Sequence, residues 1–394
     1  KRETVARFYF IVDRISLMEQ AMSEFASRGL AVFSANSRKE LMDDFKSNRT
    51  MRGSDGKPEI TVVNIQKFEE QTDKLEVTYG TNIQRVFFVD EAHRGYNPKG
   101  SFLANLMSAD TQAVRIALTG TPLLREERET WKVFGNYYDK YYYDKSIADG
   151  FTLRLMREEI ETDYKDKLLQ IIEDELGSDP EISNKDFSKR LIIQSNNYLH
   201  TLIQYVDKDL RRFRKENDDP TVAGMIVLEN NEQARKMKKL FDKFQEQFPH
   251  PLVAKLILHD EGEAEERKAI TDSFKHESAI DILIVNQMLL TGFDAHRLKR
   301  LYLTRKMQGH DLLQALTRVN RPYKEYKYGY VIDFAGIKDN FEEANDSYIR
   351  ELNACDPESA EEVEERLSLG EAIMENKEEI MDTLQHIREV LFPY

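Results

Sequence analysis

Short apolar runs alternate with helix-like segments along most of this 394-residue chain, and no other feature restricts its fold as much. Residues 8–12 have the composition of a buried strand, and residues 17–25 then repeat apolar side chains at helical spacing. Such alternation is typical of a parallel sheet with helices on both faces. The first part of the chain has four more strand-like runs, at residues 31–34, 60–65, 86–89 and 114–118.

A second alternating region begins at Thr221, and its helical patterns lie at residues 232–248, 263–276 and about 310–320. We therefore expect an α/β protein with two doubly wound parallel-sheet domains of ordinary size. The strands expected in the second domain are residues 223–228, 252–258, 281–285, 298–303 and 328–334.

Long charged segments separate and follow the two alternating regions. Apolar stripes at helical spacing, such as Leu168, Ile171 and Leu176, indicate helix from about residue 151 to the polar run before Pro220. After Ile337 the chain becomes acidic with a helical pattern. We expect four parts, namely a first domain at 1–150, a helical connector at 151–220, a second domain at 221–340 and a helical tail at 341–394.

The overall composition excludes several classes of protein. A hydrophobic fraction of 40% and a charged fraction of 32% are ordinary for a globular protein, and the longest apolar runs are too short to span a bilayer. The net charge of −14 argues against attraction of nucleic acid by the whole surface, although a local basic track is still open. Cys355 is the single cysteine and forms no internal disulfide, which fits a reducing cytoplasm.

Two carboxylates and an imidazole follow the apolar run at residues 86–89, in the sequence Asp90-Glu91-Ala92-His93. Ligands collect where the strands of a parallel sheet end. One carboxylate could hold Mg²⁺ through water, and the second could orient or deprotonate an attacking water. A solvated strand end is the alternative reading of the same residues. Three other expected strands also end in polar groups, at residues 13–14, 64–67 and 119–122.

Four motifs in this order resemble those of superfamily 2 helicases and translocases. Within that superfamily, residues 288–295 and 309–323 most resemble the HsdR restriction subunit of Type I restriction-modification enzymes, and residues 147–150 and 330–336 point the same way. The resemblance covers roughly residues 8–340 and implies two RecA-like domains that move double-stranded DNA using ATP and Mg²⁺. The motifs are Asp90-Glu91-Ala92-His93, Leu118-Thr119-Gly120-Thr121-Pro122, Thr291-Gly292-Phe293-Asp294 and Gln314-Ala315-Leu316-Thr317-Arg318-Val319-Asn320-Arg321.

The resemblance implies a role in hydrolysis for the first motif. Asp90 is the expected carboxylate on the metal side, and Glu91 is the acid that acts on water. Both would hold Mg²⁺ through water. His93 would couple this site to Gln314 or its neighbours in the second domain.

Two arginines follow Gln314 on the expected helix and, being three residues apart, would share one face. Arg321 is the expected arginine finger and Arg318 its partner, because a planar guanidinium suits phosphate oxygens. The alternative is that the pair is surface charge on an amphipathic helix.

Other motif residues are expected to contact the nucleotide or DNA. Thr119 and Thr121 would link the nucleotide state to domain movement. Gly292 and Asp294 lie in a loop that would contact the nucleotide ribose or the DNA backbone, and Thr291 of the same loop is assigned to DNA. Local hydrogen bonds within loops are the alternative reading. The other DNA contacts implied by the resemblance are Asp13, Arg14, Gln66 and Lys67.

The phosphate-binding pattern G-x-x-x-x-G-K-[ST] is absent from this sequence, since Gly56-Lys57 is followed by Pro58 and the first glycine is misplaced. In the family that loop precedes the segment near Phe8, and the nuclease lies further upstream. The chain also opens on Lys1 without an initiator Met. We therefore expect a fragment of a longer protein that hydrolyses little ATP and does not cleave DNA.

Two other functions stay open. The chain could be another superfamily 2 motor, such as an RNA helicase of the DEAH type, although those usually carry glycine where Thr317 precedes the first arginine. It could also be a module that only binds DNA or a partner subunit. The restriction-subunit reading implies double-stranded DNA and the methyltransferase and specificity subunits as partners, with no membrane.

Overall fold

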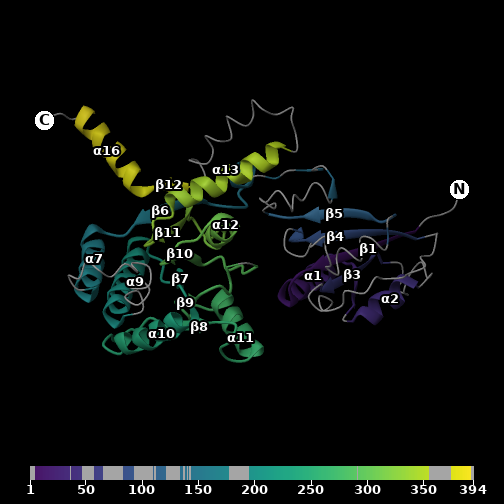
Figure 1. Cartoon of the computed structure of the whole chain (residues 1–394), viewed down its shortest axis with the longest axis horizontal. Coiled ribbons are helices and arrows are strands. Elements are labelled where there is room, and N and C mark those ends of the chain that lie inside the picture. Colours follow the sequence, from purple (N-terminus) through teal and green to yellow (C-terminus); the bar gives the residue numbers. More distant parts are fainter. Residues whose placement is uncertain are drawn as a thin grey trace. The chain divides into compact units, whose positions relative to one another are not determined.

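The structure is a computed structural model, and it describes residues 5–35, 37–46, 57–64, 83–92, 110, 112–120, 134–135, 138–139, 141, 143–176, 195–290, 292–354 and 374–391. The chain divides into two compact units, residues 1–139 with 350–357 and residues 140–349 with 358–394. Each unit is built around one parallel sheet (Figure 1). The four-part division expected from the sequence stays a prediction.

The first unit has a five-stranded parallel sheet in the order β2-β3-β1-β4-β5, which confirms all five strands expected from the apolar runs. The central strand β1 pairs with β3 on one side and β4 on the other, so that Phe10 lies opposite Val62 and Phe88. The strands are β1 (Val5–Val12), β2 (Ala31–Ala35), β3 (Glu59–Asn64), β4 (Ile83–Asp90) and β5 (Val114–Leu118).

Helices pack on both faces of this sheet. On one face, Met18 of α1 (Ile15–Ser27) shares a hydrophobic cluster with Val12 and Val62. On the other face, the ring of Phe45 from α2 (Arg38–Lys46) lies 5.1 Å from that of Tyr9. Because successive strand residues point to opposite faces, the unbroken apolar runs supply both cores.

The second unit has a seven-stranded parallel sheet in the order β12-β6-β11-β10-β7-β9-β8. Five of its strands confirm the sequence prediction, and two, β6 and β12, were not expected. The strands are β6 (Arg154–Glu159), β7 (Ala223–Val227), β8 (Ala254–Ile257), β9 (Ile282–Val285), β10 (Leu298–Leu303), β11 (Tyr328–Asp333) and β12 (Met374–Asn376).

Helices cover both faces of the second sheet (Figure 1), and each face has its own hydrophobic core. One face packs against α7 (Thr162–Leu176), α9 (Asn196–Glu216) and α10 (Asn231–Gln245). The other packs against α11 (Ala264–His276), α12 (Gly309–Leu316) and α13 (Lys338–Ala354). The three layers confirm the doubly wound architecture. Two further helices are α6 (Tyr143–Ala148) before β6 and α16 (Lys377–Leu391) after β12.

The expectation of helix throughout residues 151–220 is wrong at β6, which pairs with β11 along its whole length. The strand was missed because Arg157 and Glu158 do not fit the apolar pattern of a buried strand. Their charges find partners far along the chain, since Arg157 pairs with Asp333 at 2.8 Å and Glu158 pairs with Arg300 at 2.7 Å. Buried charges are tolerated where such partners exist.

The expectation of a wholly helical tail is wrong at β12, which pairs with β6 at the edge of the sheet. Three residues, Met374-Glu375-Asn376, are too few to produce a recognisable strand pattern. Two ion pairs connect this segment to β6, one between Arg154 and Glu375 at 2.9 Å and one between Lys377 and Glu158 at 3.1 Å. Helix is confirmed for the tail residues of α13 and α16.

A buried carboxylate fastens α9 to the second sheet. Asp209 accepts hydrogen bonds from the Arg300 guanidinium at 2.6 Å and from the Tyr302 hydroxyl at 2.9 Å, both from β10. The Arg300 guanidinium also stacks over the ring of Phe213, 4.6 Å from its centroid. Helix α9 is therefore an integral layer of this unit.

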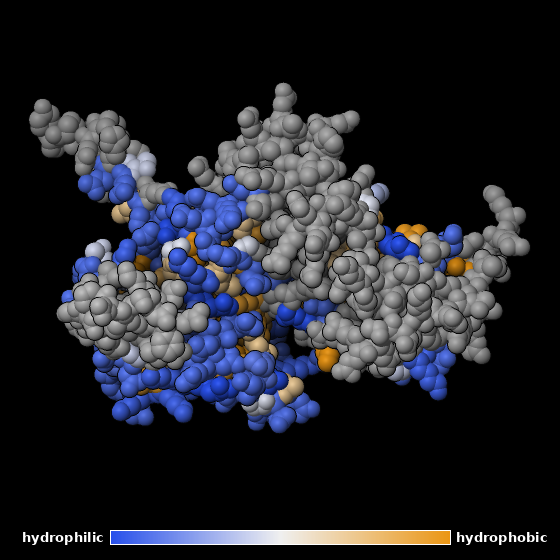
Figure 2. All heavy atoms as spheres, viewed as in Figure 1, coloured by the Kyte–Doolittle hydropathy of each residue, from blue (hydrophilic) through white to orange (hydrophobic). Residues whose placement is uncertain are grey.

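On the face of the second unit that Figure 2 shows, the described residues are mostly hydrophilic, with hydrophobic residues in small separate patches. No helix among the described residues combines the length and apolar character needed to cross a membrane.

Candidate functional site

Polar residues from four neighbouring strands lie at the carboxyl edge of the first sheet. Asp13 follows β1, Asn64 ends β3, Asp90 ends β4 and Thr119 follows β5, and these four strands are adjacent in the order β3-β1-β4-β5. The structure therefore confirms that the strand ends gather these groups at one edge. In open α/β sheets this edge is where ligands bind.

Asp90 is half-buried and its electrostatic surroundings favour a cation. Burial raises the pKa of its carboxyl, and the charge of Asp13 raises it further, while the hydrogen bond from the Glu91 N–H at 3.0 Å opposes both. A divalent cation near Asp90 and Asp13 would offset the repulsion between the two carboxylates. The residues present therefore fit a magnesium ion that keeps part of its water shell. No group of three or more His, Cys, Asp or Glu side chains among the described residues could hold a metal by itself.

Glu91 leaves the strand with a left-handed backbone, at a φ of 48°. A non-glycine residue rarely adopts this conformation, and where it does so the conformation often serves a function. Asp13 is 8% exposed and lies 3.7 Å from the guanidinium of Arg14. Five residues expected at the site lie outside the described residues, namely Gln66, Lys67, His93, Thr121 and Thr291.

In the second unit the structure brings together residues of two motifs. The Arg321 guanidinium lies 3.3 Å from the Asp294 carboxylate, and both side chains are more than one third exposed, at 37% and 41%. Gly292, two residues before Asp294, has a φ of 70°, which favours glycine. The pair links the loop before β10 to the turn after α12.

The expectation that Arg318 and Arg321 share one face of a helix is wrong, because α12 ends at Leu316. Its last turns tighten into hydrogen bonds from Arg318 N–H to the Ala315 carbonyl and from Val319 N–H to the Leu316 carbonyl. Pro322 also disfavours helical geometry in the residue before it. The helix therefore ends four residues earlier than expected.

The two arginines have different surroundings as a result. Arg318 is 8% exposed, and its guanidinium donates to the carbonyls of Phe293 at 2.5 Å and Gln314 at 3.0 Å. Gln314 itself is 7% exposed. Arg318 thus holds the loop of Asp294 against α12, whereas the Arg321 side chain points to the exposed carboxylate.

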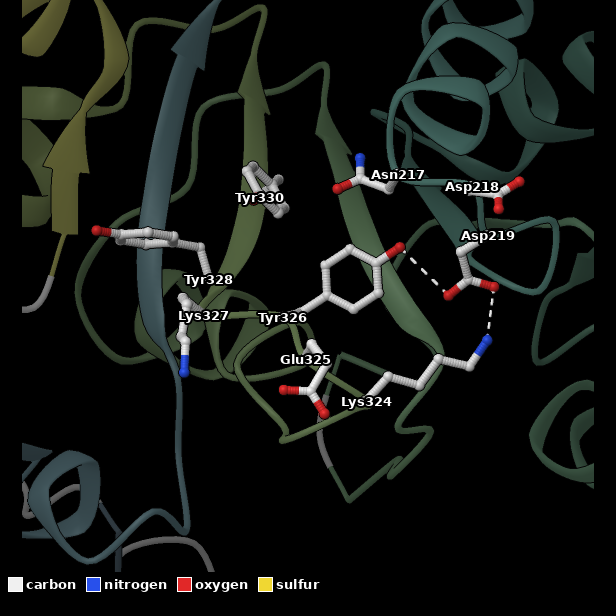
Figure 3. A pocket seen from close by; sticks show the side chains of 9 residues that line it. All are labelled: Asn217, Asp218, Asp219, Lys324, Glu325, Tyr326, Lys327, Tyr328 and Tyr330. Atoms are coloured by element: carbon white, nitrogen blue, oxygen red, sulfur yellow. Dashed lines mark hydrogen bonds and ion pairs between the residues drawn. The ribbon is translucent and has the colours of Figure 1, made fainter.

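A cavity of about 430 Å³ lies beside the loop that follows Arg321, and none of the residues expected to be catalytic or to bind nucleotide or DNA lines it. Figure 3 shows that the Lys324 ammonium and the Tyr326 hydroxyl both point to Asp219, at 2.7 and 3.2 Å. Thr221 also donates to Asp219. The lining residues are Asn217, Asp218, Asp219, Lys324, Glu325, Tyr326, Lys327, Tyr328 and Tyr330.

Asp219 is expected to stabilise this loop in a pH-dependent way. Although burial opposes it, the hydrogen bonds from Lys324 and Thr221 lower the pKa of Asp219. A carboxyl whose pKa is lower in the folded state contributes stability above its ordinary pKa and loses it as the pH falls through the folded value. The Tm of Asp219→Asn should be below that of the unaltered chain at neutral pH, and the difference should shrink below about pH 4. A difference that stays constant with pH would contradict this; Asp218→Asn, an exposed neighbour, is the control.

Two known families match successive parts of the chain, and the boundary between the two matches lies inside the second unit, between α7 and α9. Residues 1–185 match the SWI2/SNF2 ATPase family, and residues 187–336 match domain 3 of the Type I restriction enzyme subunit R. This chain belongs to the R subunits of Type I restriction enzymes. Its motifs are those of the ATPase motor region of that subunit.

Relatives of this R-subunit region come from archaea and bacteria. The MjaIXP endonuclease subunit of Methanocaldococcus jannaschii is 28% identical over 87% of this chain and 34% of its own length. The SauMRSORF196P endonuclease subunit of Staphylococcus aureus is 26% identical over 87% of this chain and 40% of its own length. The chain therefore spans between one third and two fifths of these two relatives.

A solved structure shares the fold of the R-subunit chain. The ATP-dependent Type ISP restriction-modification enzyme LlaBIII bound to DNA superposes over 89% of this chain and 26% of its own, with a TM-score of 0.52 and 11% identity. The likeness confirms the RecA-like helicase fold.

The Glu266 carboxylate accepts a hydrogen bond from the backbone N–H of Glu263 at 3.2 Å and caps α11. This role is structural.

Two residues of the R-subunit chain were missed by sequence reasoning. Asp219 reads as one more acid in a polar run, and Lys299 reads as part of a strand. A signal for the second was available, because Lys299-Arg300 places two cations inside an otherwise apolar strand. Such a conflict indicates that the fold supplies partners.

Proposed function

We propose that this chain is the part of a Type I restriction R subunit that couples ATP hydrolysis to movement along double-stranded DNA. The proposal rests mainly on one observation. Asp90, Glu91, Asp13 and Thr119 all lie at the carboxyl edge of the first sheet. The two family matches, over residues 1–185 and 187–336, support it.

Asp90 would hold Mg²⁺ through its water shell, because its carboxyl is poorly solvated and already repelled by Asp13. The ion supplies charge stabilisation to the phosphate oxygens. Glu91 would orient the attacking water and accept its proton, and its left-handed backbone lies directly after the end of β4. His93 and Thr121 are proposed, on the motif alone, to transmit the state of this site.

Arg321 is proposed as the arginine finger, since its side chain is accessible and its present partner is an exposed carboxylate. A guanidinium that reaches the transferring phosphoryl group stabilises the charge that develops there. Arg318 is proposed to position the loop of Gly292 and Asp294 through its hydrogen bond to the Phe293 carbonyl. Gln314 is proposed to connect α12 to the same loop, because its carbonyl also accepts from Arg318.

DNA contacts are proposed for Arg14, Gln66, Lys67 and Thr291, and Asp13 would position Arg14. The net charge of −14 requires these contacts to be local. The methyltransferase and specificity subunits of a restriction complex are the proposed partners, and the cytoplasm is the proposed compartment.

The test uses the natural gene product that contains this sequence beside the 394-residue chain. We expect duplex DNA to stimulate ATP hydrolysis by the gene product and RNA to have little effect. The chain itself should hydrolyse little ATP, because its sequence lacks G-x-x-x-x-G-K-[ST] to hold the β- and γ-phosphates.

Other outcomes assign other functions. Stronger stimulation of the gene product by RNA than by duplex DNA would indicate an RNA helicase. Salt-dependent duplex binding without turnover by the gene product would indicate a binding module. Rapid DNA-stimulated turnover by the 394-residue chain would refute the expectation that turnover needs the G-x-x-x-x-G-K-[ST] pattern.

A further inference from the structure

Lys299 is a buried lysine for which the proposed mechanism has no role. Its exposed fraction is 0%, although lysine is rarely buried without partners. It lies where β10 and β7 pair out of step, since Leu298 pairs with Ala223 and Arg300 pairs with Gly224. Lys299 is therefore the extra residue of a β-bulge. Bulges often re-aim a side chain beside a functional site.

The Lys299 ammonium reaches the turn that carries Arg321. It donates to the carbonyl of Val319 at 3.2 Å and to the carbonyl of Arg321 itself. A Cβ added to Gly329 of β11 would lie 2.3 Å from the same Val319 carbonyl, so this strand packs directly against the turn. The Leu153 N–H donates to the Asn320 carbonyl at 2.6 Å. The backbone of residues 319–321 is thus held from three sides, and Lys299 is the charged donor.

Two charged side chains face Lys299, namely Asp294 from the loop before β10 and Arg321 from the turn. Burial lowers the pKa of Lys299 to about 7; Asp294 opposes this shift, and Arg321 adds to it. The negative charge of Asp294 therefore acts on two cations, of which Arg321 is its ion-pair partner and Lys299 has a pKa near neutral. Protonated Lys299 weakens the ion pair between Asp294 and Arg321 for two reasons. Its positive charge repels the Arg321 guanidinium, and it also attracts the Asp294 carboxylate.

We propose that Lys299 is a positioning residue for Arg321, which fixes the backbone of the turn and, when protonated, loosens the pairing of the Arg321 guanidinium with Asp294. The proposal rests on the proposed role of Arg321 in ATP hydrolysis. With Lys299 charged, the guanidinium is available to phosphate oxygens. With Lys299 neutral, the Asp294 carboxylate pairs with Arg321 alone, and the guanidinium is not available to phosphate oxygens.

The first test follows kcat of the natural gene product between about pH 6 and pH 9. The kcat of the unaltered protein should fall as the pH rises through about 7. Lys299→Met should lower kcat about 10- to 100-fold at the low end of this range, because a small misplacement of a catalytic group has an effect of this size. The kcat of this variant should no longer fall with rising pH (the falling limb of the pH profile), and its affinity for ATP should be unchanged.

Two further variants separate charge from packing. Lys299→Arg keeps a positive charge at every pH, so it should retain turnover and remove the falling limb. Asp294→Asn removes the carboxylate that withholds the Arg321 guanidinium, so the fall of kcat with rising pH should disappear even if Lys299→Met does not fold. Lys255→Met, on the exposed side of β8, is the control and should change neither rate nor profile.

The second test needs no turnover. In the 394-residue chain, hydrogen exchange of the amides at residues 317–321 should be at least about tenfold faster in Lys299→Met than in the unaltered chain at the same pH. Equal exchange, or an unchanged falling limb in Lys299→Met, would overturn the positioning role. If Arg321→Ala leaves kcat unchanged, the proposed function of Arg321 fails instead, and the exchange result still reports the contact of Lys299 with the turn.

Discussion

Replacing Glu91 by glutamine in the natural gene product is expected to lower kcat for ATP about 100- to 1,000-fold and to leave ATP affinity nearly unchanged. Glutamine has the shape of glutamate and tolerates the same backbone, but its amide does not accept a proton from water. Glu91 directly follows the half-buried Asp90 at the carboxyl edge of the sheet. Single-turnover hydrolysis and equilibrium binding of ATP measure the two quantities separately.

The matched control for this change is Glu24→Gln on α1. Glu24 is 60% exposed on the surface of α1 and pairs with Arg28 one helical turn away. It should change neither kcat nor affinity. A Glu91→Gln protein that hydrolyses ATP at the original rate would remove Glu91 from the reaction and leave Asp90 to be tested alone.

Removing the Arg321 side chain is expected to lower kcat about 1,000-fold or more, which is the effect of losing an arginine finger. Its pair with Asp294 is more than one third exposed on both sides, and such pairs contribute at most about 1 kcal/mol to stability. Arg321→Ala should therefore unfold at nearly the original temperature. Steady-state hydrolysis and thermal unfolding of the same preparation give both results.

Arg318→Ala provides the comparison, because this arginine is buried and donates to the carbonyls of Phe293 and Gln314. Its loss leaves buried acceptors without that donor, which destabilises a protein by about 1 to 3 kcal/mol. We expect a lower Tm for Arg318→Ala than for Arg321→Ala. Normal stability with abolished turnover in Arg318→Ala, together with unchanged turnover in Arg321→Ala, would exchange the two roles.

The strands that bury apolar residues on both faces were predictable one by one. The strand β4 is recognisable from residues 86–89 alone, because an apolar run of that length bounded by polar residues fits a buried parallel strand. The strand β6 was not, since Arg157 and Glu158 become compatible with burial only through Asp333 and Arg300. Those partners are more than 140 residues away, so no local pattern contains them.

The functional residues divide in the same way. Asp90, Glu91, Asp294 and Arg321 were expected from the order and spacing of motifs, and the structure adds that Asp294 and Arg321 form a pair. Helical spacing put Arg318 and Arg321 on one face, but the helix ends at Leu316 and the two side chains have different environments. The end of a short helix depends on hydrogen bonds and packing that spacing does not encode.

The sequence by itself determined that this chain has two parallel α/β sheets and which strand ends carry acids, because apolar periodicity and residue order are local properties. Tertiary structure alone decided that β6 and β12 extend the second sheet, and that a β-bulge turns Lys299 toward the carbonyls of Val319 and Arg321. Burial of a charge depends on partners that folding brings from distant parts of the chain. The motif therefore predicts Arg321, whereas the contacts around Arg321 depend on the tertiary structure.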